Sequence, residues 1–134
     1  MRPRNTAFAL AGTAVLLTAF AFSASAQLDK LKSTTPEQRA GMQTDLMKST
    51  LGLTSEQTPK VADINLKYAK RMDPLIKGSA DPAAKGRKME EVDQQKEAEL
   101  KEVLSPEQFK AFHSAKVQMR QRVEQDIEKA VGRK

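Results

Sequence analysis

The chain has no cysteine and no tryptophan, and only one histidine and one tyrosine among its 134 residues. Without cysteine it has no disulfide to stabilise it and no lipidated cysteine to anchor it. An enzyme or a metal site needs converging nucleophiles, bases or ligands, which one isolated histidine, His113, and scattered carboxylates do not supply. The methionines suit gap-filling in a small core better than a soft copper site. We therefore expect no catalysis, no cofactor and no bound metal.

The first 26 residues differ in kind from the rest. Arg2 and Arg4 precede an uncharged run over residues 7–22, and Ala24-Ser25-Ala26 has the small-x-small pattern that a signal peptidase cleaves. This predicts a cleaved secretory signal peptide over residues 1–26 and an exported chain beginning at Gln27. An uncleaved membrane anchor is the alternative, but the alanine-rich run and its Ser/Ala end favour cleavage. Contact with a membrane is expected only through the uncleaved precursor.

The exported part, residues 27–134, is expected to form a single domain with a thin core. It has 21 basic and 17 acidic residues, so its net charge is about +4. This mild charge, together with the scarcity of aromatic side chains for base stacking, argues against nucleic acid as a partner. Leu, Ile, Val and Phe account for only 20 of its 108 residues. So few large apolar side chains predict an elongated helical molecule that buries further surface against a second copy, as a homodimer.

Apolar residues recur at spacings of three and four, with no strand-like alternation, so the fold is expected to be all-α. Capping residues, prolines and glycines divide the exported chain into four amphipathic helices at about 36–51, 55–76, 82–103 and 106–131. Asp73-Pro74 is expected to kink or end the second helix. Only Leu104 and Ser105 separate the third helix from the fourth, and this connection suits either a tight antiparallel hairpin or a kink.

The second and fourth helices repeat each other at an offset of 51 residues. Apolar positions follow in register from Val61 and Phe112 onward, and Arg71 corresponds to Arg122. Each copy opens with Leu-Thr/Ser-x-Glu-Gln, in which the hydroxyl and the glutamine form a capping box at a helix start. A shorter copy, residues 35–38, opens the first helix. The capping residues of the two full copies are Leu53, Thr54, Gln57, Leu104, Ser105 and Gln108.

These motifs, in a small exported helical chain without cysteine, resemble the LTxxQ motifs of Spy/CpxP-type periplasmic proteins. The motifs are Leu53-Thr54-Ser55-Glu56-Gln57 and the serine-substituted Leu104-Ser105-Pro106-Glu107-Gln108. The resemblance covers about residues 36–127. It implies a periplasmic, antiparallel dimer of thin, curved helical protomers that form a cradle. It also implies ATP-independent chaperone activity on unfolded envelope proteins during envelope stress. Some relatives instead repress a sensor kinase or bind heavy metals.

Under this hypothesis the client surface is amphipathic and basic. Positive charge attracts unfolded chains over a Debye length, and polarizable methionines then hold them through weak apolar contacts. Basic side chains flank the apolar stripes of the second and fourth helices. The candidate client-binding residues are Lys60, Lys67, Lys70, Arg71, Met72, Lys116, Met119, Arg120 and Arg122.

Overall fold

The computed structural model describes residues 29–132, and the predicted signal peptide lies outside them. A short helical turn over residues 29–32 precedes four helices: α2 (Pro36–Leu51), α3 (Gln57–Lys77), α4 (Pro82–Val103) and α5 (Pro106–Val131). No strand occurs among these described residues, which confirms the all-α prediction. Between residues 29 and 132, no helix combines the length and the hydropathy that crossing a bilayer requires.

The predicted capping boxes set the starts of α2 and α5. The backbone N–H of Gln38 donates to Thr35 Oγ1 at 3.1 Å, and the backbone N–H of Thr35 donates to Gln38 Oε1 at 3.0 Å. Ser105 and Gln108 make the same exchange at the start of α5. These bonds satisfy N–H groups that have no partner within the helix. At its other end α2 stops at Gly52, whose φ of 64° is left-handed and favours glycine.

Prolines shift the bounds of α3 from those expected. The capping box between Thr54 and Gln57 is present, at 3.0 and 3.1 Å. The regular helix begins only at Gln57, because Pro59 has no N–H to donate to the carbonyl of Ser55. At the far end, the helix was expected to reach about residue 76 with a kink or an end at Asp73-Pro74, and it does not end there. The helix continues through Pro74 to Lys77, which places Ile76 in a buried position, only 4% exposed.

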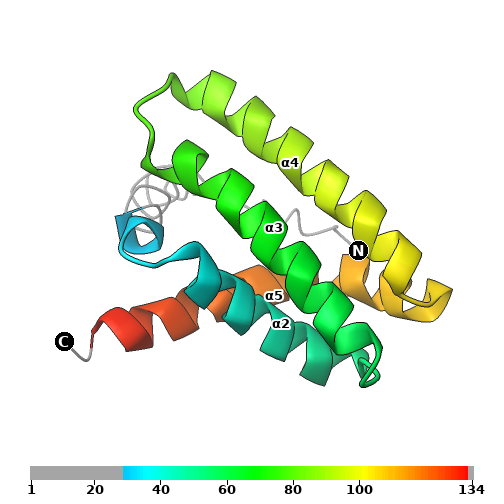
Figure 1. Cartoon of the computed structure of the whole chain (residues 1–134). Helices are drawn as coiled ribbons and strands as arrows, with labels where there is room; N and C mark the ends of the chain where they lie inside the picture. Colours follow the sequence, from blue (N-terminus) through cyan, green and yellow to red (C-terminus); the bar gives the residue numbers. More distant parts are fainter. Residues whose placement is uncertain (1–28, 133–134) are drawn as a thin grey trace, which may run out of the picture.

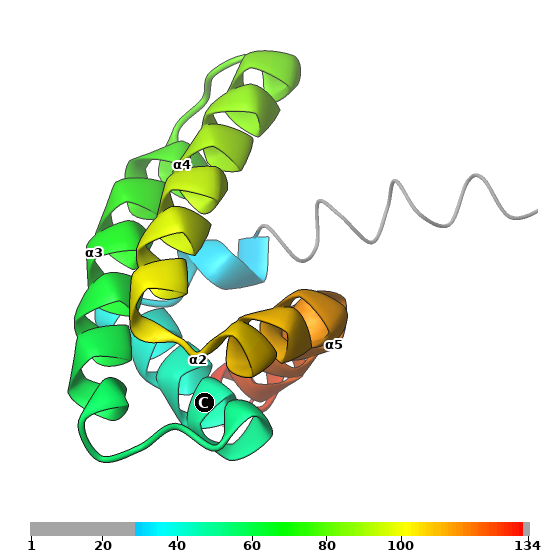
Figure 2. The same ribbon diagram turned by 90° about the vertical axis from the view of Figure 1, so that its right-hand side faces the viewer.

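The helices form an open arrangement around a central hairpin of α2 and α3 (Figure 1). Helix α4 lies along α3, and α5 lies along α2. With α2 and α3 as one half of the fold and α4 and α5 as the other, each of the two repeated helices, α3 and α5, therefore packs against one helix of the other half. Helices α4 and α5 diverge from the corner at Leu104-Ser105, so the connection is neither a tight antiparallel hairpin nor one kinked helix (Figure 2). The space between α4 and α5 consequently faces the inner sides of α2 and α3.

The core lies where the two motif copies meet. Leu53 and Leu104, the first residues of the motifs, are buried. Leu51 and Leu100, from the last turns of α2 and α4, are buried beside them. The core extends along the predicted stripes of α3 and α5, and its other members are Met47, Val61, Ile64, Tyr68, Phe112 and Met119. Helix α4 contributes only Leu100, so one side of α4 stays open along the space that it shares with α5.

Candidate functional site

The glutamines of the two motifs contact each other directly. Gln57 Nε2 donates to Gln108 Oε1 at 2.7 Å, and Gln108 Nε2 donates to Gln57 Oε1 at 3.0 Å. Each Oε1 also accepts the backbone N–H of its own capping residue, from Thr54 at 3.0 Å and from Ser105 at 2.9 Å. The amide pair therefore joins the starts of α3 and α5, and we call this pair the motif junction.

Helices α2 and α3 form one half of the fold, and α4 and α5 form the other. Each glutamine of the motif junction also bonds the end of a helix from the other half. Gln57 Nε2 donates to the carbonyl of Val103, the last residue of α4, at 3.1 Å. Gln108 Nε2 lies 3.4 Å from the carbonyls of Leu51 and Gly52, at the end of α2. Helix-end carbonyls have no partner within their own helix. One pair of side chains thus ties four helix ends together, in the approximate two-fold pattern of the repeat.

The motif junction was not predicted from the sequence, because each motif was interpreted as a local cap. The choice of glutamine was a signal for these contacts. A capping box needs only an acceptor at this position, which glutamate or glutamine can provide. Both copies have glutamine, whose amide nitrogen adds two donors that glutamate lacks. Those donors make the contacts between the two halves.

A second buried polar link, also missed, holds the chain before α2. Arg39 is only 4% exposed, and its Nη1 donates to the carbonyls of Leu31 and Thr34 at 3.1 and 2.7 Å. Its Nη2 donates to Asp73 Oδ1 on α3 at 2.7 Å. Hydrogen bonds from Arg39 and Lys77 lower the pKa of the Asp73 carboxyl. Arg39 therefore fastens residues 31–34 and α3 to α2.

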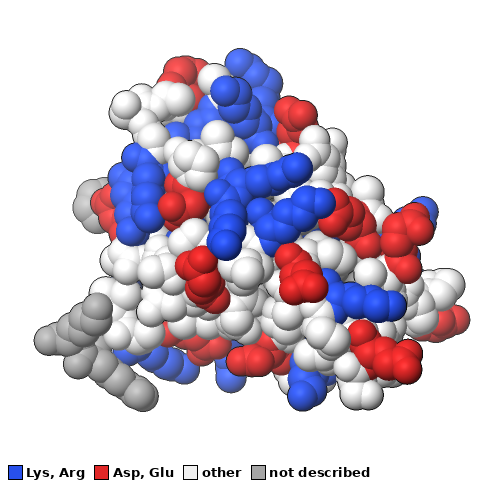
Figure 3. Space-filling view, viewed as in Figure 1, with Lys and Arg blue, Asp and Glu red and all other residues white. Residues whose placement is uncertain are grey.

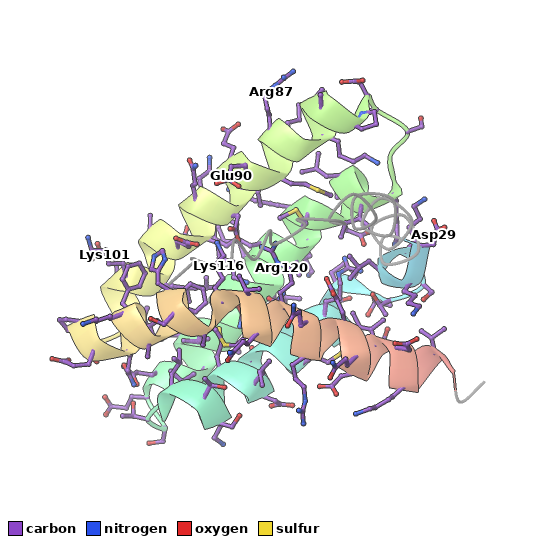
Figure 4. All side chains as sticks on the ribbon, turned by 180° about the vertical axis from the view of Figure 1, so that it is seen from behind. Asp29, Arg87, Glu90, Lys101, Lys116 and Arg120 are labelled. Atoms are coloured by element: carbon purple, nitrogen blue, oxygen red, sulfur yellow. The ribbon has the colours of Figure 1, made fainter. Side chains whose placement is uncertain are left out.

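A groove lies between α4 and α5, with α2 and α3 as its floor. It consists of two cavities of about 120 and 370 Å³, which share Gln43, Asp93, Lys96, Arg120 and Glu124. In Figure 4, Lys116 and Arg120 rise from the side of α5 that faces α4. The apolar lining of the groove consists of Leu31, Leu46, Met47, Tyr68, Ala69, Met72, Ile76, Met89, Val92, Phe112, Met119 and Val123.

Methionines from all four helices line this groove. Met47 on α2 and Met119 on α5 are buried, whereas Met72 on α3 and Met89 on α4 are partly exposed. Met42 is the only methionine after residue 26 that is not part of the lining. Core filling thus accounts for Met47 and Met119. Met72 and Met89 instead provide unbranched, polarizable side chains that adapt to differently shaped apolar ligands.

The groove is lined by charges of both signs, and only some of them are paired. Lys116 Nζ bonds both Asp93 and Glu97 of α4, and His113 Nε2 lies 3.2 Å from Glu97 Oε2. Burial lowers the pKa of Lys116, but the hydrogen bonds to Asp93 and Glu97 outweigh it, so the pKa is raised overall. Arg120, which is exposed, has no ion pair within residues 29–132. Arg120 is therefore the cation in the groove best placed to meet an acidic group on a ligand.

Lys96 is the charged group most enclosed by the groove. Its Nζ donates to Gln43 Oε1 of α2 at 2.7 Å. Burial lowers the pKa of this amine to about 8, partly offset by Asp93 and Glu97 and reinforced by Lys116. Heteronuclear NMR of the lysine side chains should show Lys96 titrating near pH 8. A midpoint near the ordinary value of about 10.4 would contradict this environment.

The same shift sets the sign of a pH effect on stability. Between pH 8 and the ordinary lysine pKa of about 10.4, the unfolded chain binds more protons at Lys96 than the folded one does. The contribution of Lys96 to the free energy of unfolding should therefore rise with pH across that window. Comparing wild type with Lys96→Met in urea titrations measures this contribution, because methionine has similar length and no proton to lose.

Residues 24–112 match a protein-family model described as "Domain of unknown function (DUF4890)". The chain belongs to this family. The searches of curated proteins and of solved structures gave no match.

The DUF4890 match covers both motif copies and the whole motif junction. It also covers α2, α3 and α4, which provide the floor and one wall of the groove. It ends at Phe112, so the part of α5 that carries Lys116, Met119 and Arg120 lies beyond it. The family match therefore includes the motif junction and the helices α2, α3 and α4. It leaves out most of α5, the second wall of the groove.

The structure divides the basic candidate residues among separate surfaces. Lys67 pairs with Glu99 of α4, and Arg71 donates to Gln95 of α4 at 2.8 Å. Lys70 lies 3.7 Å from Glu37 of α2. These exposed cations follow the outer side of α3, where Figure 3 shows Lys and Arg gathered, whereas Tyr68, Ala69 and Met72 of α3 line the groove.

The remaining candidates lie in the groove or at two other places on the surface. Lys116, Met119 and Arg120 line the groove together with Met72. Arg122 borders a separate depression beside Leu46 and Thr50 of α2, and Lys60 is exposed near the start of α3. Among residues 29–132, no three His, Asp or Glu side chains are grouped in a way that could hold a metal ion. Only four of the nine candidate client-binding residues therefore share the groove.

Proposed function

We propose that this protein is an ATP-independent periplasmic chaperone that holds unfolded polypeptide segments in the groove between α4 and α5. The observation that carries the proposal is the lining of that groove, where adaptable methionines lie beside charges of both signs and Arg120 has no ion pair among the described residues. A surface of this kind suits many apolar sequences and excludes none by shape. The resemblance of the two motifs to LTxxQ sequences supports the same activity.

The position of the groove reduces the number of candidate client-binding residues. Met72, Met119, Lys116 and Arg120 lie in it and are retained. Lys116 is already held by Asp93 and Glu97, so Arg120 is the cation that should attract acidic clients. Export, the periplasmic location and the dimeric cradle stay predictions from the sequence and from the resemblance.

Aggregation assays with several unrelated unfolded clients, without nucleotide, test the proposal. We expect suppression of aggregation for most clients, and slower capture at high salt because long-range attraction is screened. Met72→Ser with Met89→Ser should reduce suppression several-fold while far-UV circular dichroism stays unchanged. Met42→Ser is the matched control, because Met42 is also partly exposed but lies outside the groove lining.

Other outcomes distinguish the alternatives. Protection of no client, with tight binding to one sensor-kinase periplasmic domain, would identify a regulator instead. Calorimetry with copper, zinc and nickel tests the metal-responsive alternative. Equal loss of suppression in the Met42 control and in the groove variant would place the client surface elsewhere on the helices.

A further inference from the structure

We propose that the free end of the α3–α4 hairpin docks on the surface of an anionic phospholipid bilayer. The proposal starts from the uneven distribution of charge along the chain. Residues 67–88 contain seven Lys and Arg against two Asp, a net charge of +5. The remaining residues between 29 and 132 contain twelve basic and fifteen acidic side chains, a net charge of −3.

This charged segment forms one end of the molecule. It comprises the second half of α3, the connection over residues 78–81 and the first turns of α4 (Figure 1). We call its cations the basic tip: Lys67, Lys70, Arg71, Lys77, Lys85, Arg87 and Lys88. In Figure 4, Arg87 projects from this end, away from the other helices. Lys77, Lys85, Arg87 and Lys88 lie at this free end, whereas Lys67, Lys70 and Arg71 lie farther along α3 and contact Glu99, Glu37 and Gln95.

The two carboxylates within the segment are committed to the fold. Asp73 bonds the buried Arg39 at 2.7 Å and pairs with Lys77 at 2.9 Å. Asp81 accepts the backbone N–H of Ala84 as the cap of α4. Arg87 and Lys88 are exposed and make no ion pair with another described residue. Glu90 and Glu91, on the next turn of α4, bond Gln94 and Gln95 and make no ion pair with either cation among the described residues, so Arg87 and Lys88 remain available to anions outside the protein.

The tip holds these cations in place before any partner arrives. Lys85 Nζ donates to the carbonyl of Gly78 at 2.7 Å, which closes the connection between α3 and α4. With the Asp81 cap, this bond orders the turn that presents Arg87 and Lys88. Binding then costs little ordering of the backbone.

The composition of the tip favours a lipid surface over an acidic protein. Protein interfaces are anchored by large apolar or aromatic side chains. The exposed residues between the cations are instead Pro74, Gly78, Ser79, Ala80, Asp81, Pro82, Ala83 and Gly86. The large hydrophobic residues that are exposed in residues 29–132 are Val117 and Val131, both on α5. A cluster of four to eight Lys and Arg without such anchors is typical of binding to anionic headgroups, at about fivefold in affinity for each cation.

Membrane contact was expected only of the precursor, because the charge was counted over the whole exported chain. A net charge of about +4 hides a segment of +5. Docking through the tip does not depend on the proposed chaperone activity, because Arg87 and Lys88 lie outside the groove lining. In a chaperone, such docking would leave the far wall of the groove, α5, facing away from the bilayer.

Sedimentation of the full chain with vesicles tests the proposal. We expect binding to phosphatidylglycerol/phosphatidylcholine vesicles at low salt, and loss of most binding at 0.5 M salt, a condition that screens exposed charges. Vesicles of phosphatidylcholine alone measure any binding by the apolar amino-terminal segment. Arg87→Gln with Lys88→Gln should weaken the anionic-vesicle binding roughly 25-fold, from two cations at about fivefold each.

The matched control removes two cations from the opposite end of the molecule. Lys101→Gln with Lys110→Gln lowers the net charge equally, and Lys101 lies at the other end of α4 (Figure 4). This control should bind anionic vesicles nearly as well as wild type. Equal weakening by both pairs, or no binding to anionic vesicles, would overturn the proposal. Binding of poly-glutamate without binding of vesicles would also overturn it, and would assign the tip to acidic polypeptides.

Discussion

Arg39→Ala is expected to lower the free energy of unfolding by about 3–5 kcal/mol, the range for breaking a buried charge pair by removing one partner. The substitution leaves Asp73 without its bond from Nη2, and it leaves the carbonyls of Leu31 and Thr34 without their donor. Small domains have a total stability of about 5–15 kcal/mol, so this loss is a large part of it. Urea titration of wild type and variant measures the difference.

Two further variants show that the effect comes from the buried guanidinium. Arg87→Ala removes an exposed arginine of the basic tip and should change stability very little. Arg39→Lys can restore the charge pair with Asp73 but cannot bond two carbonyls and a carboxylate in a fixed fork, so it should recover only part of the loss. A loss as small for Arg39→Ala as for Arg87→Ala would contradict the role given to this link.

The pH dependence of the Arg39 effect follows from Asp73. The hydrogen bond from Arg39 holds the pKa of Asp73 below its unfolded value. A carboxyl with a lowered folded pKa stabilises the fold above its unfolded pKa of about 3.9, and this stabilisation is lost as the pH falls further. The difference between wild type and Arg39→Ala should therefore be full at pH 6 and should shrink below about pH 4.

The helices were predictable because their signals are local. Capping boxes at Thr35 and Ser105 and the spacing of apolar residues act within one or two turns, and the starts of α2 and α5 agree with them. Whether α3 would end at Pro74 was left open, because the cost of one lost backbone bond is local and its compensation is not. Burial of Ile76 and the bond between Asp73 and Arg39 come from other parts of the chain.

The candidate site was harder to predict. A sequence repeat shows which residues occupy equivalent positions, but it does not show whether those residues lie close together in the fold. Arg71 and Arg122 occupy the same repeat position and were expected to serve one surface. The approximate two-fold arrangement instead places Arg71 against α4 and Arg122 beside α2. No local sequence pattern predicts the groove. The groove depends on the angle between α4 and α5 at Leu104-Ser105, a connection that the sequence left open.

Breaking the motif junction should cost more than breaking a capping box alone. Gln57→Ala removes the bond to the N–H of Thr54 as well as the bonds to Val103 and Gln108. It also removes the bond that Gln57 Oε1 accepts from Gln108 Nε2, so four bonds at about 0.5–1.5 kcal/mol each predict a loss of about 2–6 kcal/mol. Gln108→Ala should behave similarly, whereas Thr54→Ala, which removes only the cap, should cost roughly 0.5–2 kcal/mol.

The chain provides a matched control in its third capping box. Gln38 bonds the N–H of Thr35 at 3.0 Å in the same geometry but has no partner from another helix. Gln38→Ala should therefore cost only about 1 kcal/mol, the value of one bond. If Gln57→Ala and Gln38→Ala are equally destabilising, the contacts between the halves add nothing and the motif acts only as a cap.

A double-mutant cycle isolates the amide pair itself. Because Gln57 and Gln108 each donate to the other, the second substitution removes bonds that the first has already broken. The double variant should therefore be less destabilised than the sum of the single variants, by about 1–2 kcal/mol. Gln57→Glu refines the result, because glutamate keeps the acceptor for Thr54 and loses the donors to Val103 and Gln108. We expect Gln57→Glu to lose a large part of the stability that Gln57→Ala loses, because both donated bonds disappear and a carboxylate oxygen then faces two acceptor oxygens, those of Val103 and Gln108.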